Sequence, residues 1–285
     1  MMKAAVVTAD SLPLPAADAP LIVEAFEAEG FSVETPPWSC QETAWEEFDL
    51  VLVGSAWDYH TRVDEFLAWA DRVNNATTVL NSPSFLHWNA RKTYLNQLAG
   101  AGIHVVPNLK VGPDSRYNLA RLSRYLDCEQ LVMKPVVGAG ASGIVRLEVG
   151  QEELFEATKA TGEFLVQPFI SAIYDGEVSL TMIDGKMSHA VRKIARDGDF
   201  RVQEEHGGSI VAHEASDAEQ ELAGIAMWVL PSAPLYARVD MIAFKGRPAL
   251  MELELIEPDL HLRHSAESAQ ALAASAKARL ESKQP

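Results

Sequence analysis

The chain has 285 residues, of which 48% are hydrophobic and 22% charged, so it holds enough apolar material for one large core or a few smaller lobes. This composition excludes a disordered or low-complexity chain, and we expect the whole length to fold. The 40 acidic and 24 basic residues give a net charge of -16, which disfavours nonspecific binding to nucleic acid or membrane and requires a local basic pocket for any anionic ligand.

The cysteines and the N-terminal sequence indicate the cellular compartment. Cys40 and Cys128 lie far apart, without a redox or metal-binding spacing, so we expect buried free thiols in a reducing environment. The N-terminus shows no basic leader followed by an apolar segment, and no apolar run approaches the roughly 18 residues of a membrane span. The expected location is the cytoplasm.

The first 82 residues alternate strand and helix patterns, which predicts a small parallel α/β domain. One helix runs from Asp18 to Gly30, another lies around Val63–Val73, and their apolar character leaves a homodimer open. Parallel sheets bind ligands beyond the carboxyl ends of their strands, so the loop at 54–59 is a candidate substrate edge. Packing of its Trp57 and Tyr59 between domains is the competing interpretation. Strands are predicted at residues 3–9, 31–35, 49–53 and 77–80.

The middle of the chain predicts a connecting helix and then a compact α+β module of roughly 60 residues. The helix covers Phe85–Leu98, stops near Gly100, and is followed by an extended stretch at 103–108. From Leu119 a short helix begins the module. Its third strand contains Pro168, which is tolerated only at a sheet edge or a bulge. The module's strands are predicted at 131–137, 143–149 and 163–170, with a helix at 152–159.

The C-terminal part predicts two β-hairpins, a capped helix and a final alanine-rich helix. Asp184-Gly185 is a strong turn signal between strands at 177–183 and 186–194. Ser216 and Glu219 form a capping box for a helix at Asp217–Val229. The second hairpin pairs strands at 235–244 and 250–256 through a turn at Lys245-Gly246.

This second hairpin gathers carboxylates on one face. Glu252 and Glu254 alternate with apolar residues, so they share a face, and Asp240 lies on the partner strand. Carboxylates this close repel each other unless a cation joins them, which indicates a divalent metal site on a sheet. Because Arg238 shares the face of Asp240, an ordinary salt-bridged surface is an equally good local explanation.

Several segments could bind an anion. The glycine-rich stretch at 138–143 could place backbone N–H groups against phosphate oxygens, although a mobile hairpin turn would look similar. Lys134 lies in an apolar strand, where an unpaired ammonium is costly to bury, so an anion is its expected partner. Lys92 lies on a helix, where an exposed lysine is the local expectation. The basic segment at 191–201 is either an anion site or a solvated loop.

Other residue patterns carry weaker or negative information. Glu177 could accept hydrogen bonds from ribose hydroxyls or face solvent at the start of a strand. His261 and His264 lack a nearby set of metal ligands. No nucleophile elbow and no ordered Ser/His/Asp set is present, which disfavours covalent hydrolase chemistry.

These segments, in this order, resemble the ATP-grasp superfamily, and within it the carboxylate–amine ligases similar to ribosomal protein S6 glutamate ligase and glutathione synthetase. The resemblance covers about residues 82–260 and is carried by WNARK, LVMKP and RKIARDGDFRVQEEHGGS. The sequences WDY near residue 57, SHAVRK and ELELIEP further resemble the D-cycloserine synthetase subgroup. The implied fold combines α/β and α+β parts, an ATP-grasp core behind an N-terminal parallel α/β domain.

The resemblance also implies ligands and residue roles. The ligands are ATP and two Mg²⁺ ions, with Mn²⁺ as an alternative metal. The implied metal ligands are Asp240, Glu252 and Glu254, although the last position is usually Asn in the family. The implied catalytic residues are Arg201, Lys134 and Arg192, with His189 near the substrate. The implied nucleotide-binding residues are Lys92, Lys134, Gly138, Gly140, Ser142, Gly143, Gln167, Phe169, Glu177 and Arg201.

The implied activity is that of an ATP-dependent ligase or cyclase. It would phosphorylate a small amino-acid-like substrate at oxygen and then let an amine attack, within the same molecule in the cycloserine-type case. The alternatives are a nucleotide-binding module without turnover and a metal-dependent phosphatase or kinase. The expected domains are an N-terminal substrate-side domain at 1–82, a connecting helix and strand at 83–118, a central lid with the glycine-rich loop at 119–172, and a C-terminal subdomain with the metal site at 173–285.

Overall fold

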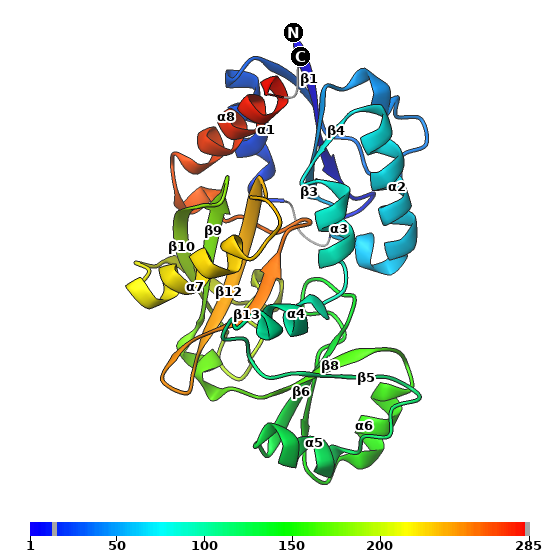
Figure 1. The fold of residues 1–285 in the computed structure, drawn as a ribbon, viewed down its shortest axis with the longest axis vertical. Coiled ribbons are helices and arrows are strands. Elements are labelled where there is room, and N and C mark those ends of the chain that lie inside the picture. Colours follow the sequence, from blue (N-terminus) through cyan, green and yellow to red (C-terminus); the bar gives the residue numbers. More distant parts are fainter. Residues whose placement is uncertain (13–15, 283–285) are drawn as a thin grey trace.

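The computed structural model describes residues 1–12 and 16–282. Its N-terminal part is a parallel sheet with the strand order β2-β1-β3-β4, as the alternating pattern predicted (Figure 1). Apolar strand residues such as Ala5, Val51 and Val53 are buried against the flanking helices. The elements are β1 (Met2–Thr8), α1 (Ala19–Ala28), β2 (Phe31–Glu34), β3 (Leu50–Ser55), α2 (Val63–Ala76) and β4 (Thr78–Leu80).

A second sheet, with the order β5-β8-β6-β7, is antiparallel throughout and lies at the opposite end of the molecule from the two termini (Figure 1). Its strands bury Leu131, Met133 and Leu147 against two helices. The stretch 103–108, predicted to be extended, forms only an isolated bridge from Val105 to Leu250, and the strand begins later. The elements are β5 (Leu109–Val111), α5 (Leu119–Leu126), β6 (Gln130–Pro135), β7 (Val145–Glu148), α6 (Glu152–Lys159) and β8 (Phe164–Pro168).

The prediction that Pro168 lies on an edge strand or a bulge is wrong. Strand β8 is an inner strand between β5 and β6, and Pro168 is its last residue, opposite Leu131. Pairing with β5 ends at Val166, so the position of the proline has a strand partner on one side only. The missing N–H of the proline is therefore tolerated within an inner strand.

The third sheet is antiparallel, with the order β11-β10-β9-β12-β13. The hairpin turns are as predicted, because Asp184, Gly185, Lys245 and Gly246 all have positive φ values, as two-residue turns of this kind require. The capping box of Ser216 and the helix after it are also confirmed. The elements are β9 (Glu177–Ile183), β10 (Lys186–Ile194), β11 (Ser209–Ala212), α7 (Asp217–Trp228), β12 (Tyr236–Phe244), β13 (Arg247–Glu254) and α8 (Ser268–Glu281).

The single helix predicted at Phe85–Leu98 is interrupted. The structure has two helices here, α3 (Pro83–Asn89) and α4 (Tyr94–Gly100), separated by a turn. In this turn the backbone N–H of Lys92 donates to the carbonyl oxygen of Val136, 2.8 Å away. A long-range contact with the β6–β7 connection thus replaces a helical hydrogen bond, and this could not be read from the helical periodicity.

Two further features complete the fold. Helix α8 packs against α1, so the C-terminal helix closes the core of the N-terminal sheet (Figure 1). Cys40 and Cys128 are free thiols, as expected, but both are partly exposed rather than buried. No helix among the described residues has the length and apolarity needed to cross a membrane. Short 3-10 helices lie at η1 (Trp45–Glu47), η2 (Tyr59–Arg62), η3 (Ser171–Asp175), η4 (Glu204–His206) and η5 (Leu262–His264).

Candidate active site

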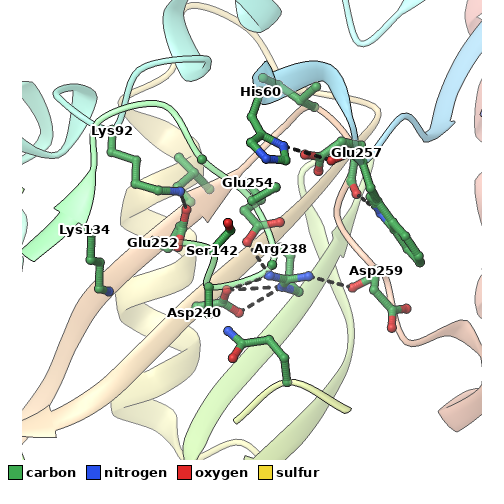
Figure 2. Close-up of a pocket in the computed structure, with 18 of the residues that line it drawn as sticks. His60, Lys92, Lys134, Ser142, Arg238, Asp240, Glu252, Glu254, Glu257 and Asp259 are labelled. Atoms are coloured by element: carbon green, nitrogen blue, oxygen red, sulfur yellow. Dashed lines mark hydrogen bonds and ion pairs between the residues drawn. The ribbon is translucent and has the colours of Figure 1, made fainter. Parts of the chain in front are cut away.

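A cavity of about 420 Å³ opens between the third sheet, the glycine-rich loop and the loop that follows β3 (Figure 2). Strands β12 and β13 form its floor. Their register places Asp240 opposite Glu252 and Arg238 opposite Glu254, with all four side chains lining the cavity. The alternate residues, such as Leu253, are buried in the core on the other face. The period-two pattern of the sequence therefore correctly predicted which residues share a face.

The carboxylates of this face are all paired with cations. Arg238 donates from Nε to Oδ1 of Asp240 at 3.0 Å, and it also donates to Glu254. Lys193 lies 3.3 Å from Asp240, and Lys92 forms an ion pair with Glu252. The salt bridges expected for an ordinary charged surface are thus present. Because Asp240 is only 2% exposed, however, this network lines a cavity and is not a solvated surface.

These acids fit a divalent cation in chemistry and charge. Within residues 1–12 and 16–282, no group of three or more His, Cys, Asp or Glu side chains has the geometry of a formed metal site. Burial, with repulsion from Glu252 and Asp240, nevertheless raises the pKa of Glu254 to about 7 against the effect of Arg238. Carboxylate oxygens are the ligands that Mg²⁺ prefers, and a cation here would relieve this repulsion.

Three lysines reach the cavity, and they differ in their partners. Lys92 and Lys193 are ion-paired with Glu252 and Glu177 respectively. Lys134, on β6, has no hydrogen-bond or ion-pair partner in the described part of the chain, and burial lowers its pKa. A partly buried ammonium without an ion pair fits an anionic ligand, and such a ligand stays the predicted partner of Lys134.

The glycine-rich loop covers the same end of the cavity. Gly138, Gly140 and Ser142 line the cavity, while Gly143 lies at the base of the loop. Gly140 and Gly143 have φ values of +59° and +71°, and a Cβ atom on Gly143 would lie 2.9 Å from Cγ of Pro135. These positions therefore require glycine, and the loop keeps its backbone close to the ligand space.

A smaller cavity of about 70 Å³ adjoins the first, and its lining includes Gln167, Phe169, Glu177 and Arg201. The Nε2 atom of Gln167 is buried without a hydrogen-bond partner among the described residues. Arg201 is held by Asp199, with 2.8 Å between Nη2 and Oδ2. An unsatisfied buried donor is uncommon in native proteins, so this cavity fits a ligand with a polar acceptor such as a purine edge.

Two predicted residues lie elsewhere. Arg192 lines neither cavity; it donates to the carbonyl oxygen of Asp175 at 3.2 Å and lies 3.3 Å from Nδ1 of His213. His189 contacts Ser268 at 3.0 Å. The neighbour of Arg192, Lys193, points into the cavity, because successive residues of a strand face opposite sides. The catalytic role of Arg192 stays a prediction.

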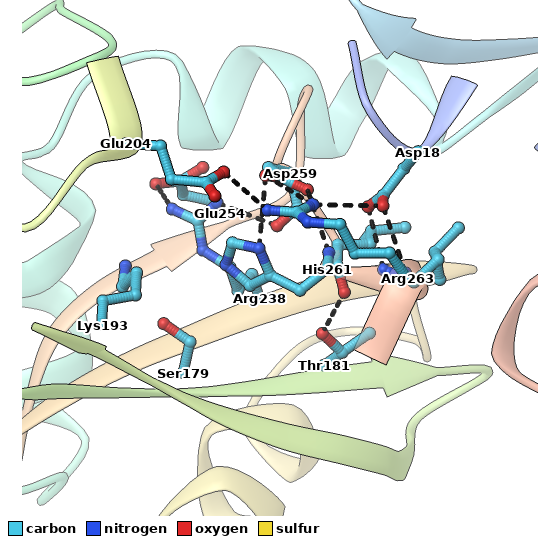
Figure 3. A network of polar contacts seen from close by, with 12 residues as sticks. Asp18, Ser179, Thr181, Lys193, Glu204, Arg238, Glu254, Asp259, His261 and Arg263 are labelled. Carbon is cyan, nitrogen blue, oxygen red and sulfur yellow. Dashed lines mark hydrogen bonds and ion pairs between the residues drawn. The ribbon is translucent and has the colours of Figure 1, made fainter. Parts of the chain in front are cut away.

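The sequence indicated Lys193 only as one cation of the basic segment at 191–201, and it did not predict that the segment after β13 lines the cavity. His261 lies in the wall of the cavity, 2% exposed, and neither ring nitrogen has a hydrogen-bond partner in the described region. Burial lowers the pKa of His261 to about 4, although Asp259 lies 3.2 Å away. Figure 3 shows the surrounding network, in which Arg263 joins Asp259 to Asp18 of the N-terminal region. The sequence signals near this segment were the ELELIEP resemblance and the pair of His261 and His264, which lacks a set of metal ligands.

The loop after β3 shows features of both predicted roles, the substrate edge and the packing contact. Trp57 and Tyr59 both line the cavity, as expected for a substrate edge. The indole Nε1 of Trp57 also donates to the main-chain oxygen of Glu257 at 3.1 Å, which joins this loop to the segment after β13.

Comparison with known proteins gives matches over most of the chain. Residues 4–81 match the model of the D-cycloserine synthetase DcsG N-terminal domain, and residues 106–245 match that of the prokaryotic glutathione synthetase ATP-grasp domain. The cycloserine biosynthesis protein DcsG of Streptomyces lavendulae is 29% identical over 93% of this chain and 94% of its own length. Glutathione synthetase of Thermosynechococcus vestitus is 27% identical over 53% of this chain and 48% of its own length.

Solved structures agree with these matches. The crystal structure of D-cycloserine synthetase DcsG superposes with a TM-score of 0.88 at 28% identity, covering 98% of this chain and 99% of the other. A D-alanine–D-alanine ligase from Bacillus anthracis has a TM-score of 0.71 at 15% identity over the full length of both chains, which shows the fold alone.

The chain therefore belongs to the ATP-grasp superfamily, in the branch of carboxylate–amine ligases. Ligases of this superfamily use ATP and a divalent metal ion. Within the branch, the chain is similar to D-cycloserine synthetase in sequence and structure over nearly its whole length.

Proposed function

We propose that this protein is an ATP-dependent ligase or cyclase that activates the carboxylate of a small amino-acid-like substrate and joins it to an amine. The observation that carries the proposal is the cavity in which Lys92 and Lys134, under the glycine-rich loop, face the carboxylates of β12 and β13. This arrangement combines cations for a polyphosphate with oxygen ligands for its metal ion.

The residues suited to each ligand follow from their places in the two cavities. Lys92, Lys134 and the backbone of 138–143 would contact the phosphates, with Arg201 near them. Asp240, Glu252 and Glu254 would hold Mg²⁺, two ions by analogy with the family, with Mn²⁺ as an alternative. The bound metal supplies positive charge that neutralises the phosphate oxygens. Gln167, Phe169 and Glu177 would hold the nucleoside part of ATP.

The reaction needs two bond exchanges and no protein nucleophile. A substrate carboxylate oxygen attacks the γ-phosphorus, and the bond between that phosphorus and the oxygen of ADP breaks. A substrate amine then attacks the activated carbonyl carbon, phosphate leaves, and the nitrogen loses a proton. Lys92 and Lys134 would stabilise the charge that develops on the phosphoryl oxygens. Arg238, the guanidinium between Asp240 and Glu254, would supply a positive charge near the reacting carboxylate.

For the second step we propose intramolecular attack, which closes a small ring. This part of the proposal is supported by the similarity to D-cycloserine synthetase, which extends over the N-terminal domain at 4–81 as well as the nucleotide-binding part. It would place the protein in antibiotic biosynthesis.

A turnover assay with ATP, Mg²⁺ and a panel of amino acids and their O-substituted serine derivatives tests the proposal. We expect phosphate release that depends on one class of substrate, together with a product containing a new C–N bond by mass spectrometry. Nucleotide binding without turnover on any substrate would indicate a binding module, and phosphate release without a new C–N bond would indicate a phosphatase or kinase.

The variant Glu252→Gln sharpens this test. It removes a charge from the acidic face of the cavity, and we expect it to lower turnover at least 100-fold while the circular dichroism spectrum stays that of the wild type. Glu221→Gln on α7, an exposed side chain outside both cavities, is the matched control. Equal turnover in the two variants would contradict the metal role of Glu252.

A further inference from the structure

Glu257 is a buried acid in the wall of the cavity whose carboxyl group forms no ion pair with the residues that the structure describes. It is 6% exposed and lines the cavity three residues after Glu254. Its main-chain oxygen accepts the hydrogen bond from Trp57, but its carboxylate has no hydrogen bond or ion pair with any residue that the structure describes. Burial and repulsion from Glu254 raise the pKa of Glu257 to about 8, so its ionised form is favoured only when a ligand supplies positive charge.

The free charges of the cavity lie at its two ends. Figure 2 shows Lys134 on one side, near the glycine-rich loop, and Glu257 on the other side, next to His60. Between them, the carboxylates of Glu252 and Glu254 are already joined to Lys92 and Arg238. Among the described residues, Lys134 therefore lies without an ion pair at the end suited to phosphates, and the buried carboxyl group of Glu257 lies without an ion pair at the end formed by the N-terminal loop.

The surroundings of Glu257 favour an ammonium group over a metal ion. The side chains of Trp57, Tyr59 and His60 line the same end of the cavity, and aromatic faces attract organic cations. The nearest acids along the chain are Asp259, which is bound by Arg263, and Glu254, which is bound by Arg238, and the described residues hold no group of three candidate metal ligands. A single carboxylate beside aromatic rings suits a ligand group that carries one positive charge and several N–H donors, as an ammonium does.

We propose that Glu257 binds the primary ammonium group of the substrate and so selects cationic amino compounds. The inference rests on the proposed function, because an ammonium held by Glu257 would orient the neighbouring carboxylate of the substrate toward the phosphate end of the cavity. Glu257 would thus be a specificity-determining residue, holding the α-ammonium of the amino-acid-like substrate class and fixing its orientation toward Lys92 and Lys134.

Calorimetric titration with defined amines tests this assignment. The probes are D-cycloserine, D-serine and D-alanine, titrated in the presence of ADP and Mg²⁺. Their deaminated counterparts, isoxazolidin-3-one, 3-hydroxypropanoate and propanoate respectively, are titrated in the same way for comparison. We expect the wild type to bind at least one amine and to prefer it over the deaminated compound. In Glu257→Gln the affinity for the amine should fall roughly 10- to 100-fold, with a smaller loss in Glu257→Asp.

The nucleotide and control titrations separate the possible results. ADP affinity should be the same in the wild type and Glu257→Gln, and Glu221→Gln should bind amines as the wild type does. The assignment is overturned if the wild type binds none of the amines, or if Glu257→Gln binds them as tightly as the wild type does. In either case, retained ADP binding would still support the proposed function. A loss of Mg²⁺-dependent ADP binding in Glu257→Gln would identify a metal ligand and also overturn it.

Discussion

Lys134 and Lys193 both reach the cavity, yet only Lys193 has carboxylates at its ammonium group, 2.5 Å from Glu177 and 3.3 Å from Asp240. Burial lowers the pKa of Lys134, whereas Asp240 and Glu177 outweigh burial and raise the pKa of Lys193. A paired buried charge contributes to the fold, while an unpaired one is retained at a cost. We therefore expect a substitution of Lys134 to weaken ligand binding without lowering the stability of the folded protein.

Replacing Lys134 with Met tests this separation. The variant should lose at least tenfold in ADP affinity, because the cation for the phosphates is gone, but keep or slightly raise its unfolding midpoint in the absence of ligand. Calorimetry with ADP and Mg²⁺ and a urea titration measure the two quantities. Lys186→Met, at an exposed position of β10, serves as the control. A large loss of stability without a change in affinity would make Lys134 a structural residue.

His261 gives a pH dependence of stability with a defined sign. Burial lowers the pKa of His261 from its usual value of 6.5 to about 4, so the folded protein binds this proton more weakly than the unfolded chain. The contribution of the neutral imidazole to stability is complete above pH 6.5 and is lost progressively as the pH falls from 6.5 to about 4. Between pH 7 and 4.5 the wild type should lose about 2 kcal/mol more than His261→Gln in urea unfolding. Parallel pH profiles of the two proteins would show that His261 is not responsible.

At the scale of the elements, the open edge of β13 is covered by side chains of α3 and α4. Asn89 donates from Nδ2 to the oxygen of Leu253 at 2.7 Å and accepts from the N–H of Leu255 at 2.8 Å. The hydroxyl of Tyr94 accepts from the N–H of Leu253 at 2.9 Å. These side chains replace a neighbouring strand, and they fix the part of β13 that carries Glu252 and Glu254.

The variant Asn89→Ala should therefore destabilise the protein. It leaves the buried carbonyl group of Leu253 in β13 and the buried N–H of Leu255 just after β13 without partners, at a cost of roughly 3 kcal/mol in the free energy of unfolding. Urea unfolding measures the change. Asn96→Ala, at an exposed position of α4, should change stability by less than about 0.5 kcal/mol. Equal effects at the two positions would contradict the edge-covering role of Asn89.

At the scale of the whole molecule, buried polar side chains join the N-terminal sheet to the segments that line the cavity. Asn81 donates to the main-chain oxygens of Tyr236 and Leu255, both at 2.9 Å, and Asp18 accepts from the N–H of Leu262 at the same distance. The cavity walls thus come from parts of the chain that are far apart in sequence, and a ligand that contacts several of them should stabilise the whole assembly.

ADP with Mg²⁺ is expected to raise the stability of the protein. At about 100 times its dissociation constant, a ligand that binds only the folded state adds about 2.7 kcal/mol to the free energy of unfolding. Thermal unfolding with and without ADP and Mg²⁺ measures this effect, and Lys134→Met should show less of it at the same ligand concentration. No shift in the wild type at millimolar nucleotide would contradict an ATP-binding role.

The sequence by itself determined the local structure and the order of the motifs. The two turns at Asp184-Gly185 and Lys245-Gly246, the capping box of Ser216 and the shared face of Glu252 and Glu254 were all predictable, because turn preferences, capping and strand alternation depend on neighbouring residues. The motif order was enough to indicate the superfamily, which the comparisons then confirmed.

Only the tertiary structure decided which charges have partners. Lys92 and Glu252 are 160 residues apart, and the break between α3 and α4 that brings them together depends on a contact with Val136. The same holds for Lys193, which faces the cavity while Arg192 does not, and for Glu257, whose missing partner is visible only once the cavity is formed. Pairing and burial of charge are set by long-range packing, for which a single sequence carries no local signal.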